Sequence, residues 1–179
     1  MTLIEVDVVK AVASPVAPAF VRGVLQRAAA VPEVAARMPA GMASVAVRMM
    51  GDAEMRRLNR TFAGEDHATD VLSFTGSGDH LGDLAISWPA VIRQARLYRH
   101  PQKTELALLC VHGLLHLLGW DHATAAQARE MTRLTRAALA LSDVKPASRR
   151  LSIPTNSEDR RRKPQAGLPS RSPRVRGDP

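Results

Sequence analysis

The chain has 179 residues, of which 45% are hydrophobic and 23% charged, and its net charge is +8. These values fit one globular domain and exclude collagenous, coiled-coil and wholly disordered chains. The longest apolar run, near 106–111, is far shorter than the roughly 20 residues of a bilayer span, so no membrane contact is predicted. The N-terminus has no signal-peptide pattern and a single cysteine allows no internal disulfide, so we expect a cytoplasmic protein.

The positive charge is concentrated at the C-terminal end. Residues 146–179 hold nine Lys and Arg against three acidic residues, which is a net +6 of the total of +8. This segment is rich in Pro, Ser and Arg and buries too little apolar surface to offset the entropy of ordering it. We therefore predict a domain over 1–145 and a disordered basic tail over 146–179. The tail is expected to add nonspecific contact with nucleic-acid phosphates or, alternatively, to be simply solvated.

Periodicity of apolar residues predicts the elements of the domain. Strands are predicted at 4–8, 44–50, 70–74 and 83–87. Helices are predicted at 17–30, 53–61, 90–99, 104–118 and 124–141. Asp52 is a candidate N-cap for the second helix, and the last two strands resemble a hairpin. This mixture predicts an α+β fold, with a small mixed β-sheet of about four strands covered by helices, while the strand order stays open.

Three histidines fall within eleven residues, at positions 112, 116 and 122. His112 and His116 are one helical turn apart and share a face, so both can bind one ion. If Gly119 ends the helix and the chain turns back, His122 supplies a third ligand. Three imidazoles with an open fourth position are typical of a catalytic zinc site, although nickel, copper and iron accept the same ligands. We predict one Zn²⁺ per chain rather than three buried structural histidines, which would be unfavourable without partners.

The spacing H-x-x-x-H-x-x-G-x-x-H is also that of the metzincin zinc proteases, with one difference. Their second position is the glutamate that works as general base, and here that position is Gly113. The pattern therefore predicts the metal site without the peptidase chemistry.

Four motifs, taken in order along the chain, resemble the YbeY-type bacterial endoribonucleases, also called rRNA maturation factors. The motif of the three histidines together with an upstream T-D-V-L-S-F segment is highly specific as a pair. The matching segments are Asp52…Leu58-Asn59…Phe62, then Asp66-His-Ala-Thr-Asp-Val-Leu-Ser-Phe74, then Gly82-Asp-Leu-Ala-Ile86, and Glu105-Leu…Val111-His-Gly-Leu-Leu-His-Leu-Leu-Gly-Trp-Asp-His122.

The resemblance implies a small α+β metal-dependent hydrolase, with zinc held by His112, His116 and His122. It further implies an endoribonuclease that cleaves single-stranded RNA in rRNA processing, namely the 3′ end of the small-subunit rRNA, and that takes part in ribosome quality control. Single-stranded RNA, ribosomal RNA and the small ribosomal subunit are therefore the expected partners.

The sequence departs from the family at one position. The family commonly carries an arginine directly after the aromatic residue of its N-x-x-[YF]-R stretch, where it is thought to serve activity, and here Phe62 is followed by Ala63. A guanidinium there would suit a phosphate oxygen, and the neighbouring Arg56, Arg57 or Arg60 are alternative sources. We expect Ala63 to weaken cleavage. The alternative is a non-catalytic ribosome-associated assembly factor with a mainly structural zinc site.

The other catalytic candidates are less specific than the histidines. Without a glutamate at position 113, the base comes from elsewhere, and Asp121 is the nearest carboxylate in sequence. Asp121 alternatively fixes the turn or orients an imidazole. Ser73 is a candidate cleft residue on an edge strand, and Cys110 is expected in the core. Surface roles are expected for three further histidines, His67, His80 and His100.

Overall fold

This computed structural model describes residues 3–151, which form an α+β domain with a four-stranded mixed sheet, as predicted. The strands are β1 (Leu3–Lys10), β2 (Met42–Met50), β3 (Val71–Thr75) and β4 (His80–Ser87). The helices are α1 (Pro18–Ala29), α2 (Pro32–Ala35), α3 (Asp52–Ala63), α4 (Trp88–Tyr98), α5 (Gln102–Leu117), α6 (Ala125–Ala140) and α7 (Ser148–Leu151). None of the helices within 3–151 has the length and apolar character needed to cross a bilayer.

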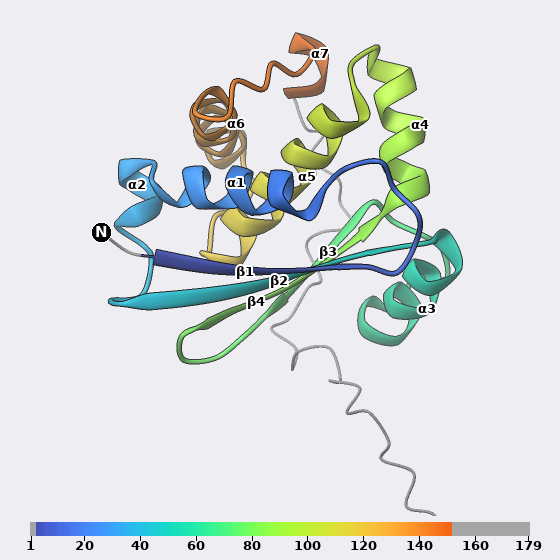
Figure 1. Ribbon diagram of the computed structural model, residues 1–179, viewed down its shortest axis with the longest axis horizontal. Helices are drawn as coiled ribbons and strands as arrows, with labels where there is room; N and C mark the ends of the chain where they lie inside the picture. Colours follow the sequence, from blue (N-terminus) through green and yellow to red (C-terminus); the bar gives the residue numbers. More distant parts are fainter. Residues whose placement is uncertain (1–2, 152–179) are drawn as a thin grey trace, which may run out of the picture.

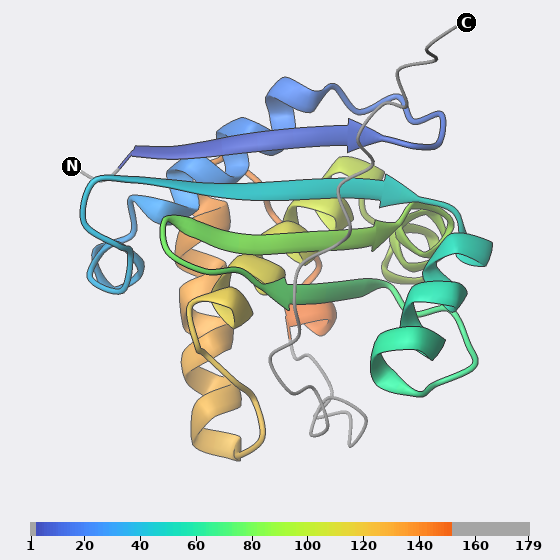
Figure 2. The same cartoon turned by 90° about the horizontal axis from the view of Figure 1, so that it is seen from below.

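The strands lie in the order β1-β2-β4-β3, with β1 and β3 at opposite edges of the sheet (Figure 2). Neighbours are parallel except for β3 and β4, which form the predicted antiparallel hairpin. Strand β4 begins at His80, three residues before the predicted start, because His80 already pairs with Ser44 of β2. This order leaves β3 with a sheet neighbour on one side among the described strands.

The two faces of the sheet are covered unequally (Figure 1). Most helices pack on one face, where α5 supplies an unbroken buried segment from Thr104 to Leu115. Helix α3 packs on the other face, where Leu72 and Phe74 of β3 meet Met55. Because side chains alternate along a strand, Ser73 lies on the face that α5 covers. The main core lies between the sheet and α5.

The C-terminal boundary of the domain differs from the prediction. Helix α7 lies within the predicted tail, and its Arg150 is 5% exposed. The difference arises because Arg150 pairs with the buried Glu105, so an arginine that looks like tail charge belongs to the core. The remainder of the predicted tail, 152–179, lies outside the described residues.

The start of α3 also differs from the prediction. Gly51 is the N-cap, and Asp52 is the first helical residue. The Asp52 carboxylate accepts hydrogen bonds from Ser87 Oγ at 2.6 Å and from Arg93 Nη1 at 2.7 Å. The hydrogen bond from Arg93 holds the pKa of Asp52 below its usual range. Asp52 therefore fastens α3 to the start of α4 instead of capping its own helix.

Candidate metal centre

The C-terminal half of α5 carries the first two histidines of the candidate site. His112 and His116 lie one turn apart, and their Nε2 atoms are 2.9 Å from each other. His112 is buried, whereas His116 is half-buried. The buried leucines on the remaining sides of α5 fix its rotation, so the two imidazoles are directed to one point.

The chain after α5 brings the third histidine back to the first two. Gly119 has a φ of 88°, a left-handed conformation that favours glycine. Its N–H donates to His116 O, and the N–H of Trp120 donates to Leu115 O, both at 3.0 Å, which is a Schellman motif. After this reversal the ring centroid of His122 lies 5.4 Å from that of His112 and 5.1 Å from that of His116.

The three side chains fit a metal ion. One ligand nitrogen from each of His112, His116 and His122 lies within 4.8 Å of the other two. His112 and His122 are only 6% and 4% exposed, and imidazoles buried this deeply are unfavourable unless their nitrogens are satisfied. A donor set of converging imidazole nitrogens suits the first-row transition metals. The predicted histidine group therefore forms in the structure.

Position 113 explains the difference from the protease motif. A Cβ atom on Gly113 would lie 2.7 Å from Cδ2 of Leu84, which is fully buried in β4. Helix α5 therefore packs against β4 without space for a longer side chain. A glutamate at this position would have to displace the buried Leu84 side chain.

The other predicted site residues are distributed around the helix. Ser73 pairs with Leu84 in the β3–β4 hairpin, on the sheet face beside α5. Asp121 is exposed, and its Oδ1 accepts a hydrogen bond of 2.7 Å from the backbone N–H of His122. Ala63 ends α3 on the opposite face of the sheet, where the preceding Phe62 stacks edge-on against Phe74 at 5.1 Å.

The structure corrects the environment of one histidine. His100 was expected at the surface, but its side chain is 4% exposed, and its Nε2 lies 2.7 Å from Oε2 of Glu105. Its Nδ1 accepts the N–H of Ala147, so the proton is on Nε2, which donates to Glu105. Cys110 lies in the core, as predicted, and burial raises its pKa to about 12.

Arg37, a residue that no sequence motif includes, lies against the turn between His116 and His122. Its guanidinium carbon is 3.7 Å from the centroid of the Trp120 ring, and its Nη1 donates to the carbonyl of Leu118 at 3.4 Å. No local pattern marks this arginine, because 81 positions separate Arg37 from Leu118.

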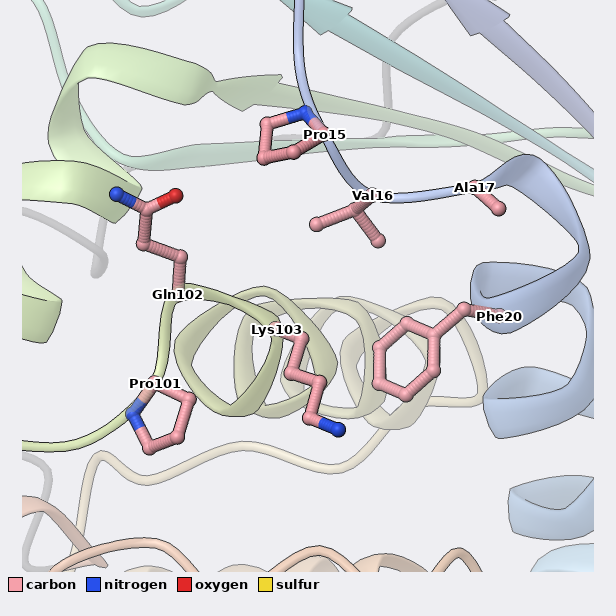
Figure 3. Close-up of a pocket in the computed structure, with 7 residues that line it drawn as sticks. All are labelled: Pro15, Val16, Ala17, Phe20, Pro101, Gln102 and Lys103. Atoms are coloured by element: carbon pink, nitrogen blue, oxygen red, sulfur yellow. The ribbon is translucent and has the colours of Figure 1, made fainter.

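An open pocket of about 390 Å³ lies at the other end of α5 (Figure 3). It is lined mainly by apolar side chains from the segment before α1, from the first turn of α1 and from the chain at the start of α5. The lining residues are Pro15, Val16, Ala17, Phe20, Pro101, Gln102 and Lys103. Because the histidines lie at the opposite end of the helix, this pocket is separate from the candidate metal centre.

Fold and site together define an α+β protein with a three-histidine candidate metal centre on a helix and the turn that follows it. The chain belongs to the Endoribonuclease YbeY family, whose model matches residues 10–142. It is 45% identical over 131 residues to an Endoribonuclease YbeY of Moorella thermoacetica, covering 65% of this chain and 81% of that one. An Endoribonuclease YbeY of Chloroflexus aurantiacus is 46% identical over 123 residues, covering 61% and 79%.

The fold also matches a solved structure. The solution structure of a Thermotoga maritima protein superposes with a TM-score of 0.50 at 20% identity, covering 78% of this chain and 90% of that one. At this identity the match supports the fold alone.

Proposed function

We propose that this protein is a zinc-dependent endoribonuclease that cleaves single-stranded RNA in the cytoplasm. Its proposed substrate is the 3′ end of the small-subunit rRNA, and its proposed role extends to ribosome quality control. The convergence of His112, His116 and His122, in a chain of the Endoribonuclease YbeY family, carries this proposal.

The three histidines would hold one Zn²⁺. When bound, the ion would supply a Lewis acid that lowers the pKa of a water and polarises a phosphoryl oxygen. The hydrogen bond from the His122 N–H to Asp121 supports a positioning role for that carboxylate, because it holds the turn that presents His122. Asp121 remains the candidate base nearest in sequence. Ser73, which is half-buried on the edge strand β3 beside α5, is the proposed contact to the substrate.

A second candidate function is a ribosome-associated assembly factor in which the zinc is mainly structural and no RNA is cleaved. Ala63 favours it, because an alanine supplies no charge for a phosphate. A zinc peptidase is disfavoured because position 113 is a glycine packed against Leu84 and supplies no base.

Cleavage of a fluorescently labelled single-stranded RNA with the small-subunit 3′ sequence tests the proposal. The zinc-loaded protein is expected to cleave it, while His112→Ala and a chelated sample are not, and added zinc should restore the chelated sample. His67→Ala is the matched control, because His67 is half exposed on a loop. A duplex of the same sequence should remain uncut.

One result would decide for the assembly factor, and a second would identify the cause. A folded, zinc-loaded protein that binds small ribosomal subunits and leaves the RNA intact would contradict the nuclease. If Ala63→Arg then produces cleavage, the site is otherwise complete, and Ala63 is the reason for inactivity.

A further inference from the structure

Arg37, which follows α2, is held against the turn that links His116 to His122. Its guanidinium lies 3.7 Å over the ring of Trp120 and donates to the carbonyl of Leu118, the C-cap residue of α5. A Cβ on Gly119 would lie 3.9 Å from its Nη1. The charged group is therefore adjacent to the backbone that positions the third histidine.

Within residues 3–151, most of the hydrogen-bonding capacity of this guanidinium is unused. Arginine offers five N–H donors, and Arg37 makes one hydrogen bond to the described residues. The side chain is exposed, and no carboxylate among residues 3–151 forms an ion pair with it. By contrast, Arg93 is paired with Asp52, and Arg133 with Glu33. Arg37 thus presents a positive charge, not balanced by a carboxylate within residues 3–151, at the turn between His116 and His122.

We propose that Arg37 binds a backbone phosphate of the RNA strand that occupies the three-histidine site. This inference rests on the proposed function. A guanidinium forms charge-assisted, bidentate hydrogen bonds to phosphate oxygens. Stacking on Trp120 already restricts the side chain, so little further conformational entropy is lost when the phosphate binds.

A purely structural role for Arg37 has different consequences. A cation near the last carbonyls of a helix stabilises the helix end through its dipole. In that case its loss would lower the stability of the fold and the affinity for zinc, with no specific effect on RNA. Binding and stability therefore have to be measured on the same variants.

The test compares Arg37→Gln with Arg22→Gln. Arg22 is also exposed and also donates to a backbone carbonyl, that of Val6 at 3.2 Å, but it lies by β1 at the sheet edge opposite β3. Both variants remove one positive charge. Binding of a single-stranded RNA oligonucleotide to the full-length, zinc-loaded proteins is followed by fluorescence anisotropy at several salt concentrations. Binding is measured in the cold, and gel electrophoresis confirms that the oligonucleotide stays uncleaved.

Arg37→Gln is expected to weaken binding about tenfold, the effect of losing one charge-assisted hydrogen bond. The slope of log K against log salt should fall by about 0.7, the value for one phosphate contact on a single strand. Zinc content and thermal midpoint should stay as in the wild type, and Arg22→Gln should bind normally. Arg37→Lys should retain the salt slope while losing part of the affinity, because lysine keeps the charge but lacks the planar guanidinium that binds phosphate through two hydrogen bonds.

Three results would overturn the inference. Unchanged affinity and salt slope in Arg37→Gln would show that no phosphate is bound there. A fall in affinity that accompanies loss of zinc would assign Arg37 the structural role, and an equal fall in Arg22→Gln would indicate only long-range charge. If the wild type neither binds nor cleaves RNA, the proposed function itself fails. If the wild type cleaves RNA and Arg37→Gln binds and cleaves it equally well, only the inference about Arg37 fails.

Discussion

The two ends of helix α5 place polar groups in the same leucine-rich segment in different ways. Near its start, the fully buried carboxylate of Glu105 receives hydrogen bonds from Arg150 at 2.7 and 2.9 Å and from His100 at 2.7 Å. Near its other end, the imidazole nitrogens of His112 and His116 converge with that of His122. At the first end the chain supplies the charge that balances the carboxylate. At the second end the three imidazoles form a group that could hold an added metal ion.

This difference separates stability from chemistry along one helix. Burial alone would lower the pKa of Arg150, but the hydrogen bonds to Glu105 reverse this and raise it, so the guanidinium stays charged. A buried pair whose members satisfy each other is unavailable to a ligand. The three imidazoles at the other end form a group that could hold a metal ion. We therefore expect substitutions at the first end to affect folding and those at the second to affect metal binding.

The largest effect is expected for Arg150→Ala. Removing the guanidinium leaves the Glu105 carboxylate buried without its cation, which costs about 3–5 kcal/mol of unfolding free energy. Urea denaturation measures this loss, with Arg149→Ala as control, because Arg149 is exposed in the same short helix. The control should change stability by less than about 0.5 kcal/mol. Equal effects of the two variants would mean that α7 is not part of the domain.

The second largest effect concerns the metal end. At a free zinc concentration of 100 times Kd, zinc should raise the unfolding free energy of the wild type by about 2.7 kcal/mol. His116→Ala removes one of three ligands, so most of this gain should disappear together with the bound zinc. Zinc content and unfolding with and without chelator measure both quantities, and His67→Ala should behave as the wild type. A full gain in His116→Ala would locate zinc elsewhere.

The metal end was predictable from the sequence because its signals are local. His112 and His116 need only helical periodicity, and a glycine at 119 indicates where the helix ends. The hairpin of β3 and β4 was predictable for the same reason, since short apolar runs flank a glycine-bearing loop. The α+β class followed from these elements, but the order of the strands depends on long-range packing that periodicity does not contain.

The buried charges at the start of α5 could not be predicted, because the partners of Glu105 are distant in sequence. Glu105 and Arg150 are 45 positions apart, and Arg150 stands in a segment whose average composition indicates disorder. A composition average conceals one arginine that has a buried partner. The surface expectation for His100 was wrong for the same reason, since nothing near it in sequence reveals the Glu105 carboxylate. Arg37 was missed because it meets Trp120 only in the folded chain.

Cys110 lies between the two ends of α5 and should make the free energy of unfolding of the protein sensitive to alkaline pH. Burial raises its pKa from 9.0 to about 12, so the folded thiol stays protonated while the unfolded thiol ionises. This contribution to stability is complete below pH 9 and is lost as the pH rises towards 12. At pH 10 the loss is about 1.4 kcal/mol. Urea denaturation at pH 8 and pH 10 should show this extra loss in the wild type and not in Cys110→Ala.

The smallest effect is expected for Gly113→Ala, which tests the close packing of the histidine-bearing part of α5 against β4. The added Cβ would lie 2.7 Å from Cδ2 of Leu84, and such overpacking costs about 1–3 kcal/mol. Alanine regains about 1 kcal/mol of helix propensity, so the net loss should be on the order of 1 kcal/mol. Urea denaturation measures it.

The matched background is Leu84→Ala, in which the clashing methyl group is absent. If the contact of α5 with β4 is the cause, adding Gly113→Ala to that background should be neutral or stabilising, because the gain in helix propensity remains and the clash does not. The same loss in both backgrounds would instead mean that Gly113 is needed for a reason other than this contact. Zinc content measured alongside then shows whether the position of His112, next to Gly113 on α5, depends on that close approach.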